Sequence, residues 1–141
     1  MNKNYPSRTS PTDDAGTEIA KHISALKSLS DYSVRELVQH AEKFGPALRQ
    51  QRLETNQIRK FLDAINQLKA QLISSSFADI EAEVVLLKPK LAYAATRQNA
   101  VEPLQRVMSA AIDKTHNAED FKRLVQLIES IIAYHKAAGE K

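Results

Sequence analysis

The chain has 141 residues and an apolar fraction of 43%, which suits one globular domain and excludes a wholly disordered chain. It has no cysteine, so disulfides, thiol catalysis and cysteine-based zinc sites are excluded, and its net charge of +3 alone predicts no partner. No apolar run approaches the ~20 residues that cross a bilayer and no signal-peptide core is present, so we expect a cytosolic protein without a membrane partner.

The N-terminal region divides into two parts. Residues 1–16 are polar and show no apolar periodicity, so we expect a flexible tail there and a helical domain over 17–141. Residues 17–29 carry apolar side chains at helical spacing. This spacing predicts a short helix that is loosely attached to the rest.

The next helix begins with a recognisable signal. Ser33 and Glu36 form a capping box, in which each side chain satisfies a free amide of the first turn. Gly45-Pro46 is expected to end or bend this helix, because proline lacks the donor that a helix interior needs. Residues 47–54 then predict one or two further helical turns.

A long helix is expected to follow, with Thr55 as its N-cap. Its apolar stripe consists of Ile58, Phe61, Leu62, Ile65, Leu68 and Leu72, and its polar face of Asn56, Arg59, Asp63 and Asn66. Ser76 and Asp79 form a second capping box at the start of another helix. Pro89 is expected to break that helix near Lys88, with a short helix over residues 90–97 after it.

Two more helices complete the chain. Pro103 fits the first turn of one, and Asn117 is the expected cap of the last. Their apolar stripes are Leu104, Val107, Met108, Ala111 and Ile112, and then Phe121, Leu124, Val125, Ile128, Ile131 and Ile132. No strand alternation and no repeat is present. The pattern predicts an all-α, single-domain bundle of five or six helices.

The sequence offers no catalytic constellation. The four histidines are not at metal-ligand spacing, and His135 is better explained as a favourable charge at a helix C-terminus. Asp79, Glu81 and Glu83 lie early in a helix, where acids are stabilising, and no glycine-rich phosphate loop exists. We therefore predict no catalytic residue, no metal and no cofactor, although a small helical enzyme stays open as a third possibility.

Positive charge is concentrated in two segments, 43–60 and 88–97. If the helix is continuous, Arg52 and Arg59 share one face with Asn56 between them and lie about 10 Å apart, the scale of neighbouring phosphates. Lys60 is turned about 100° away from Arg59. The alternative is an ordinary solvated surface with weak pairs such as Lys60 with Asp63.

The aromatic residues are few. Phe61 and Phe121 fall on core stripes, and Tyr93 and Tyr134 are more often half-buried packing than stacking platforms. The surface is therefore expected to hold phosphates without reading bases. A helical adaptor whose basic face binds an acidic protein partner stays open as the alternative function.

Three segments carry a resemblance to a known family. They are TNQIRKF (55–61), LKPKLAYAATR (87–97) and FKRLVQLIESIIAYHK (121–136). In this order, and from about Ser33 to the C-terminus, the chain resembles the small subunit of type III-A CRISPR interference complexes, the Csm complexes. Thr96 stands where a small residue, often Gly, is expected.

The resemblance implies a non-catalytic subunit of a CRISPR RNA-guided ribonucleoprotein. Several copies would stack beside the backbone subunits as the inner filament and would bind the backbone of paired crRNA and target RNA, with the large subunit as a further partner. Catalysis would belong to those other subunits. By motif position, the resemblance assigns RNA-backbone contact to Arg59, Lys60, Lys88, Lys90 and Arg97. The charge pattern adds Arg49 and Arg52.

Overall fold

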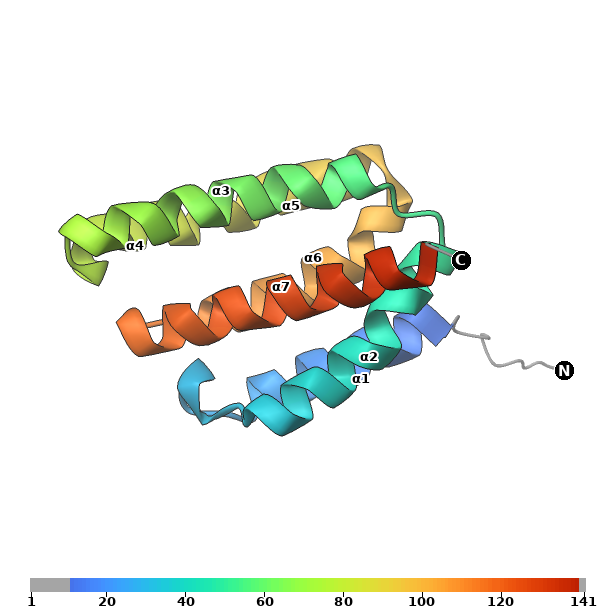
Figure 1. Cartoon of the computed structure of the whole chain (residues 1–141), viewed down its shortest axis with the longest axis horizontal. Helices are drawn as coiled ribbons and strands as arrows, with labels where there is room; N and C mark the ends of the chain where they lie inside the picture. Colours follow the sequence, from blue (N-terminus) through green and yellow to red (C-terminus); the bar gives the residue numbers. More distant parts are fainter. Residues whose placement is uncertain (1–10, 140–141) are drawn as a thin grey trace, which may run out of the picture.

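The computed structural model describes residues 11–139 of the chain (Figure 1). These residues form seven α-helices and two 3₁₀ turns and contain no strand. The elements are α1 (Pro11–Ser24), η1 (Leu29–Asp31), α2 (Val34–Gln50), α3 (Thr55–Ser74), α4 (Phe77–Val85), α5 (Leu87–Arg97), η2 (Asn99–Val101), α6 (Glu102–Asp113) and α7 (Ala118–Gly139). Only Leu86 separates α4 from α5, so these two helices form one interrupted rod. The predicted all-α bundle is confirmed.

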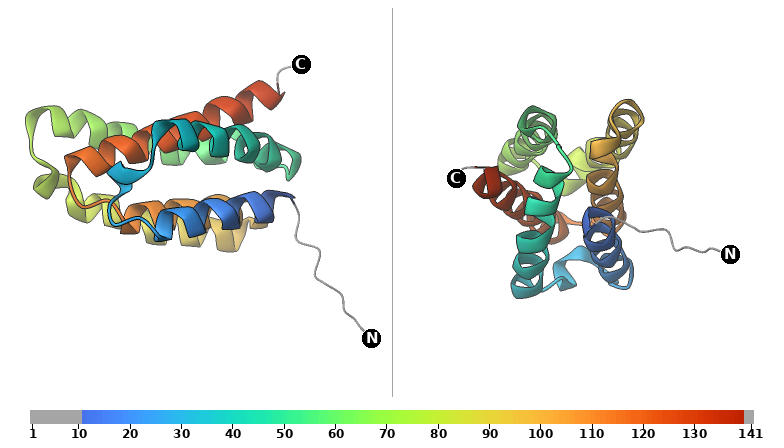
Figure 2. Two further views of the ribbon diagram at one scale, coloured as in Figure 1. Left: turned by 90° about the horizontal axis from the view of Figure 1, so that it is seen from below. Right: turned by 90° about the vertical axis from the view of Figure 1, so that its right-hand side faces the viewer.

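The helices are arranged in two layers, which the end-on view in Figure 2 shows as two columns. One layer contains α3, α7 and α2, and the other contains α4–α5, α6 and α1 (Figure 1). The most extensive helix contacts are those of α2 with α7 and of α1 with α6. Helix α7 is central, since it packs on α2, α3 and α6, and its buried residues include the whole predicted stripe. The core therefore lies along α7 and between the two layers.

Helix α1 begins earlier and packs more firmly than the sequence predicts. It starts at Pro11 rather than at residue 17, because proline is well suited to a first helical turn. Gly16 approaches α2 and α6 closely, since an added Cβ would lie 3.3 Å from Phe44 Cε1 and 3.7 Å from Pro103 Cβ. Ile19 and Ile23 are buried in the core. The expected loose attachment is wrong, and residues 1–10 of the expected tail lie outside the described residues.

Helix α2 does not end at Gly45-Pro46 but continues to Gln50. Gly45 faces the backbone of α7, where an added Cβ would lie 2.7 Å from both the Ile131 carbonyl oxygen and the His135 nitrogen. The absence of a side chain at this position lets the two helices approach. Ser33 caps the helix as predicted, accepting a hydrogen bond of 3.0 Å from the Glu36 amide.

The end of α2 determines where the next helix can begin. Arg52 has a φ of 70°, the left-handed conformation that usually belongs to glycine. The amide of Leu53 donates to the Leu48 carbonyl and that of Arg52 to the Arg49 carbonyl, both at 3.0 Å. This is a Schellman motif with buried leucines at its two hydrophobic positions. The helix is therefore not continuous from Arg52 to Arg59, and the shared face predicted for them does not form.

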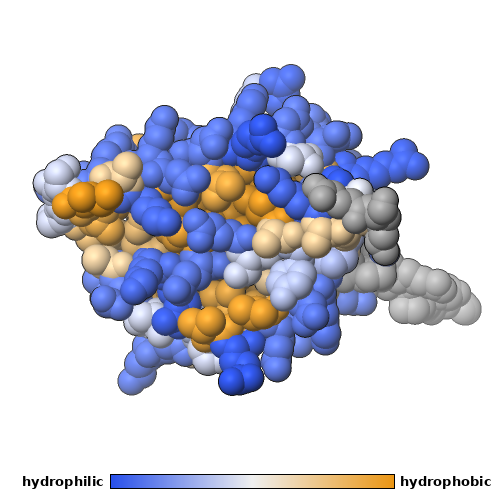
Figure 3. All heavy atoms as spheres, in the orientation of Figure 1, coloured by the Kyte–Doolittle hydropathy of each residue, from blue (hydrophilic) through white to orange (hydrophobic). Residues whose placement is uncertain are grey.

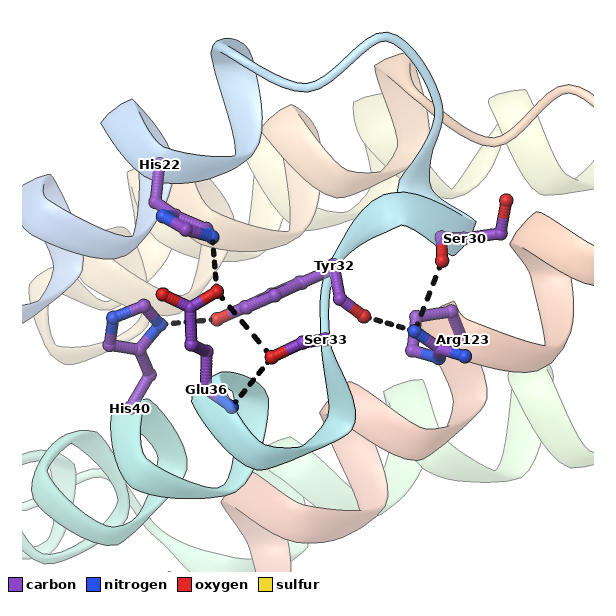
Figure 4. Close-up of polar contacts among 7 residues, drawn as sticks. All are labelled: His22, Ser30, Tyr32, Ser33, Glu36, His40 and Arg123. Carbon is purple, nitrogen blue, oxygen red and sulfur yellow. Dashed lines mark hydrogen bonds and ion pairs between the residues drawn. The ribbon is translucent and has the colours of Figure 1, made fainter.

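A polar cluster joins the segment after α1 to α2 and α7 (Figure 4). The Tyr32 hydroxyl lies 2.6 Å from His40 Nδ1. Arg123 of α7 donates to the carbonyls of Ser30, at 3.2 Å, and of Tyr32. Asp120, fully buried at the start of α7, accepts from the Ser28 hydroxyl and the Ser30 amide. These contacts fix the 28–33 segment on the end of α7.

Candidate nucleic-acid interface

A groove of about 480 Å³ lies between α3 and α5. Residues of α3, α5 and the segment after α5 line it. They are Gln57, Lys60, Phe61, Ala64, Leu87, Lys90, Leu91, Tyr93, Ala94, Arg97, Gln98 and Val101. The lining contains three cations and no acid. Both predicted basic segments thus contribute to one concave surface.

Helical periodicity explains which side chains reach the groove. On α5, Lys90, Tyr93 and Arg97 are three and four residues apart and so share one face. On α3, Lys60 lines the groove while Arg59, which is also exposed, does not. This agrees with the ~100° turn between consecutive helical residues.

The groove has an apolar floor and a cationic rim. Phe61, Leu87, Leu91 and Val101 are buried core residues that also line it. The cations at the rim belong to helices held by different neighbours, because α3 packs on α4 and α7 while α5 packs on α6. The predicted place of Phe61 on the core stripe is confirmed, and Leu91 is buried as well.

The two lysines that flank Pro89 have different surroundings. Helix α5 begins at Leu87, two residues before Pro89, because proline is tolerated in a first turn whose amides have no helical partner. The expected break near Lys88 therefore occurs earlier, at Leu86. Lys88 forms an ion pair of 2.5 Å with Asp113 of α6, whereas Lys90 lines the groove. Pro89 does not hold both ammonium groups at one site.

The other predicted contact residues lie outside the groove lining. Arg49 is half-buried, donates weakly to the Thr55 hydroxyl at 3.4 Å and lies against Gly139 near the end of α7. Thr55 is the first residue of α3 rather than its cap, since Glu54 occupies that position and its amide donates to Gln57 Oε1 at 3.0 Å. Arg52 is exposed in the turn before α3. The structure thus brings Lys60, Lys90 and Arg97 together, but not the other four cations.

Tyr93 is not the half-buried packing residue that the sequence predicts. It is 65% exposed at the groove, with the Arg97 guanidinium carbon 5.8 Å from its ring centroid. Tyr134, by contrast, is half-buried against the core, as expected. The sequence contains a signal for the difference: Tyr93 is in register with Lys90 and Arg97 rather than with the buried Leu87 and Leu91.

His135 is not a charged residue at a helix end, as the sequence predicts, but a fully buried one. Its Nε2 lies 2.9 Å from the Leu53 carbonyl and donates to it. Burial lowers the pKa of His135, and the nearby charges of Arg49 and Lys136 lower it further against the effect of that hydrogen bond. The imidazole is therefore neutral at pH 7 and joins α7 to the turn that follows α2.

Among residues 11–139, no three histidine, aspartate or glutamate side chains are placed to hold a metal ion. None of the helices in this range combines the length and apolar character of a membrane span.

The groove lies within the part of the chain that a known family matches. The family model described as Csm2 Type III-A matches residues 31–141. The chain belongs to this family. It is a small subunit of the type III-A Csm complex, as the three sequence segments indicated. Comparison with curated proteins gives no match, and comparison with solved structures gives none. In this Csm2 chain, helix α1 packs in the core although it precedes the matched residues.

Proposed function

We propose that this Csm2 chain is a non-catalytic subunit that holds RNA in the groove between α3 and α5. Several copies stack along the inner filament of the cytoplasmic effector complex, beside the backbone and large subunits. Each copy presents Lys60, Lys90 and Arg97 to the phosphates of crRNA and target RNA. Sequence recognition is left to base pairing between the two RNA strands.

The observation that supports this proposal is the unbalanced charge of the groove. Among the described residues, no acidic side chain lies within ion-pair distance of Lys60, Lys90 or Arg97. Lys88, Lys69 and Arg106 are paired, with Asp113, Glu129 and Glu102. Other described cations, such as Arg59, form no ion pair either, so what distinguishes Lys60, Lys90 and Arg97 is that they line one groove whose lining contains no acid. Unpaired cations on a concave surface focus positive potential, which attracts a polyanion such as RNA.

The test compares two lysines two residues apart. Lys90→Ala removes a groove cation, while Lys88→Ala removes a cation that Asp113 already neutralises. A triple variant of Lys60, Lys90 and Arg97 to Ala removes the whole rim. Affinity of the full chain for guide-paired RNA and for single-stranded RNA is measured by fluorescence anisotropy over a range of salt concentrations.

Each phosphate contact contributes about 0.9 to the slope of log affinity against log salt for a duplex, or about 0.7 for a single strand. We expect Lys90→Ala to lower the slope by one such increment, the triple variant by two to three, and Lys88→Ala to leave it unchanged. An unchanged slope in the triple variant would refute the proposal. It would favour the alternative, an adaptor for an acidic protein.

A further inference from the structure

Phosphate binding alone does not explain one feature of the groove, the exposed ring of Tyr93. Tyr93 stands largely in solvent, at 65% exposure, on the same helical face as Lys90 and Arg97. The Arg97 guanidinium lies 5.8 Å from the centroid of its ring. An exposed tyrosine beside an arginine offers a planar apolar face and a cation to a planar ligand.

The floor of the groove is also apolar. Phe61, Leu91 and Val101 are core residues whose edges reach its surface, and Ala64 and Ala94 keep it open because their side chains are small. The volume of about 480 Å³ is in the range of small-molecule sites, which combine apolar walls with a few polar groups. A phosphate strand lying along the rim would leave this floor unoccupied.

The polar groups at the edge suit a base rather than a fatty or aliphatic ligand. Gln98 is exposed and its side-chain amide carries both donors and acceptors. Gln57 uses its Oε1 at the start of α3, so its amide nitrogen is left for a ligand. Side-chain amides of this kind can hydrogen-bond to the edges of any of the four bases.

A protein partner fits these observations less well. Cores of protein interfaces are depleted in charged residues, lysine in particular, whereas the groove has two lysines and an arginine around its apolar floor. Combined positive charge and an exposed aromatic ring are typical of sites that bind single-stranded nucleic acid.

We propose that the groove accepts an unpaired nucleotide, with the base stacked on Tyr93 above the apolar floor. The phosphates on either side of that nucleotide would contact Lys60, Lys90 and Arg97. This inference rests on the proposed RNA-binding function and adds a ligand preference to it. Unpaired or splayed RNA binds this groove in preference to a continuous duplex, because paired bases are stacked within the helix and cannot reach the ring.

The experiment uses three RNAs: a single strand, the same strand with abasic positions, and a full duplex. Tyr93→Ala is compared with Tyr93→Phe, which keeps the ring, and with Ile73→Ala, which removes an apolar side chain that is 87% exposed outside the groove. Because Tyr93 is exposed, the melting temperature of the variants is expected to match that of the wild type. A strand with 2-aminopurine reports stacking directly, because its fluorescence is quenched against an aromatic ring.

Tyr93→Ala should lower affinity for the single strand about 5- to 150-fold, the range for loss of one base–aromatic contact, and leave the salt slope unchanged. Tyr93→Phe and Ile73→Ala should retain affinity, and abasic RNA should bind the wild type and Tyr93→Ala equally. If RNA binds with the predicted salt dependence but Tyr93→Ala changes no affinity, or weakens duplex and single strand alike, the stacking inference is wrong and the proposed function stands. If the wild type binds none of the RNAs, both proposals fail.

Discussion

The substitution Gly45→Ala tests how closely α2 and α7 pack. An alanine Cβ at this position would lie 2.7 Å from the Ile131 carbonyl oxygen and the His135 nitrogen, and 2.8 Å from Tyr134 Cβ. Two of these atoms belong to the backbone of α7, so no rotamer change can relieve the overlap. The helices must separate by several tenths of an ångström along the most extensive helix contact in the bundle.

The size of the effect follows from two opposing contributions. Overpacking of a well-packed core typically costs about 1–3 kcal/mol, more when backbone has to move. Replacing glycine by alanine inside a helix contributes about 1 kcal/mol of stability in return. Because backbone has to move here, the upper part of that range applies, about 2–3 kcal/mol, and we expect a net loss of about 1–2 kcal/mol. This corresponds to a melting temperature lower by roughly 3–8 °C for a domain of this size.

Gly16→Ala is the matched control. Its nearest obstacle is the ring of Phe44 at 3.3 Å, a side chain that can shift slightly, and the other close atom is 3.7 Å away. The same gain in helix propensity should therefore leave this variant as stable as the wild type or more stable. Both variants are compared by urea denaturation and thermal melting. The reasoning fails if Gly45→Ala is no less stable than Gly16→Ala.

Two further predictions concern the turn after α2 and the buried ionisable groups. Arg52→Gly should raise the free energy of unfolding by about 0.5–1 kcal/mol in urea denaturation, because the residue has a φ of 70°, which glycine adopts without strain. Arg52→Ala should give no such gain. Equal free energies for the two variants would contradict the left-handed turn. Burial lowers the pKa values of His40 and His135 in the folded state, so the unfolded chain takes up their protons first and stability should fall as pH drops below about 6.5. The pKa of Asp120 is lowered by hydrogen bonds from Ser28, His116 and Ser30, which outweigh its burial, so a further loss should follow below about pH 4. Melting temperatures from pH 8 to pH 3 check both steps. A double variant of His40 and His135 to Gln should show a smaller change of melting temperature between pH 7 and pH 5. If that change is as large as in the wild type, the first loss of stability does not come from these two histidines.

Helical periodicity predicts most of the fold, because each amphipathic helix shows in its own sequence which face must be buried against its neighbours. The stripes of α3, α6 and α7 are buried almost as the sequence indicates, since apolar residues at helical spacing can be covered only one way in a two-layer bundle. Capping transfers in part: Ser33 accepts from the Glu36 amide and Asp79 accepts from the Ser76 amide at 3.0 Å. Glu54 rather than Thr55 caps α3, and the Glu36 carboxylate lies 3.5 Å from His22 Nε2 instead of accepting from the Ser33 amide. Both signals depend on residues within four positions of each other.

The errors occur where distant parts of the chain decide the outcome. Nothing near His135 in sequence indicates that the Leu53 carbonyl will meet its ring, nor does anything near Lys88 point to Asp113. Gly45-Pro46 has the composition of a helix end, but contact with α7 keeps the helix continuous across it. For the same reason, charge patterns find the cations but cannot say which of them are already neutralised.

The two layers diverge at two edges, one between α1 and α2 and the other between α3 and α5, and the two edges are packed differently. Between α1 and α2 the space is filled by rings: those of His22 and Tyr32 are 5.0 Å apart and those of His22 and His40 are 5.2 Å apart (Figure 4). Between α3 and α5 the small side chains of Ala64 and Ala94 leave a groove instead. The 28–33 segment joins the filled edge to α7 through partly buried hydrogen bonds of Asp120 and Arg123.

The open edge is not simply an incomplete core. The face drawn in Figure 3, which carries α3, α7 and α2, is mostly hydrophilic, with apolar surface in the seams between helices and at the end where α3 leads into α4. A defect in packing would expose apolar atoms without regard to charge. Around the α3–α5 groove, however, every charged side chain of the lining is a cation, and each is in helical register to reach it. Because α3 packs on α4 and α7 while α5 packs on α6, the two helices that line the groove are each supported by other helices.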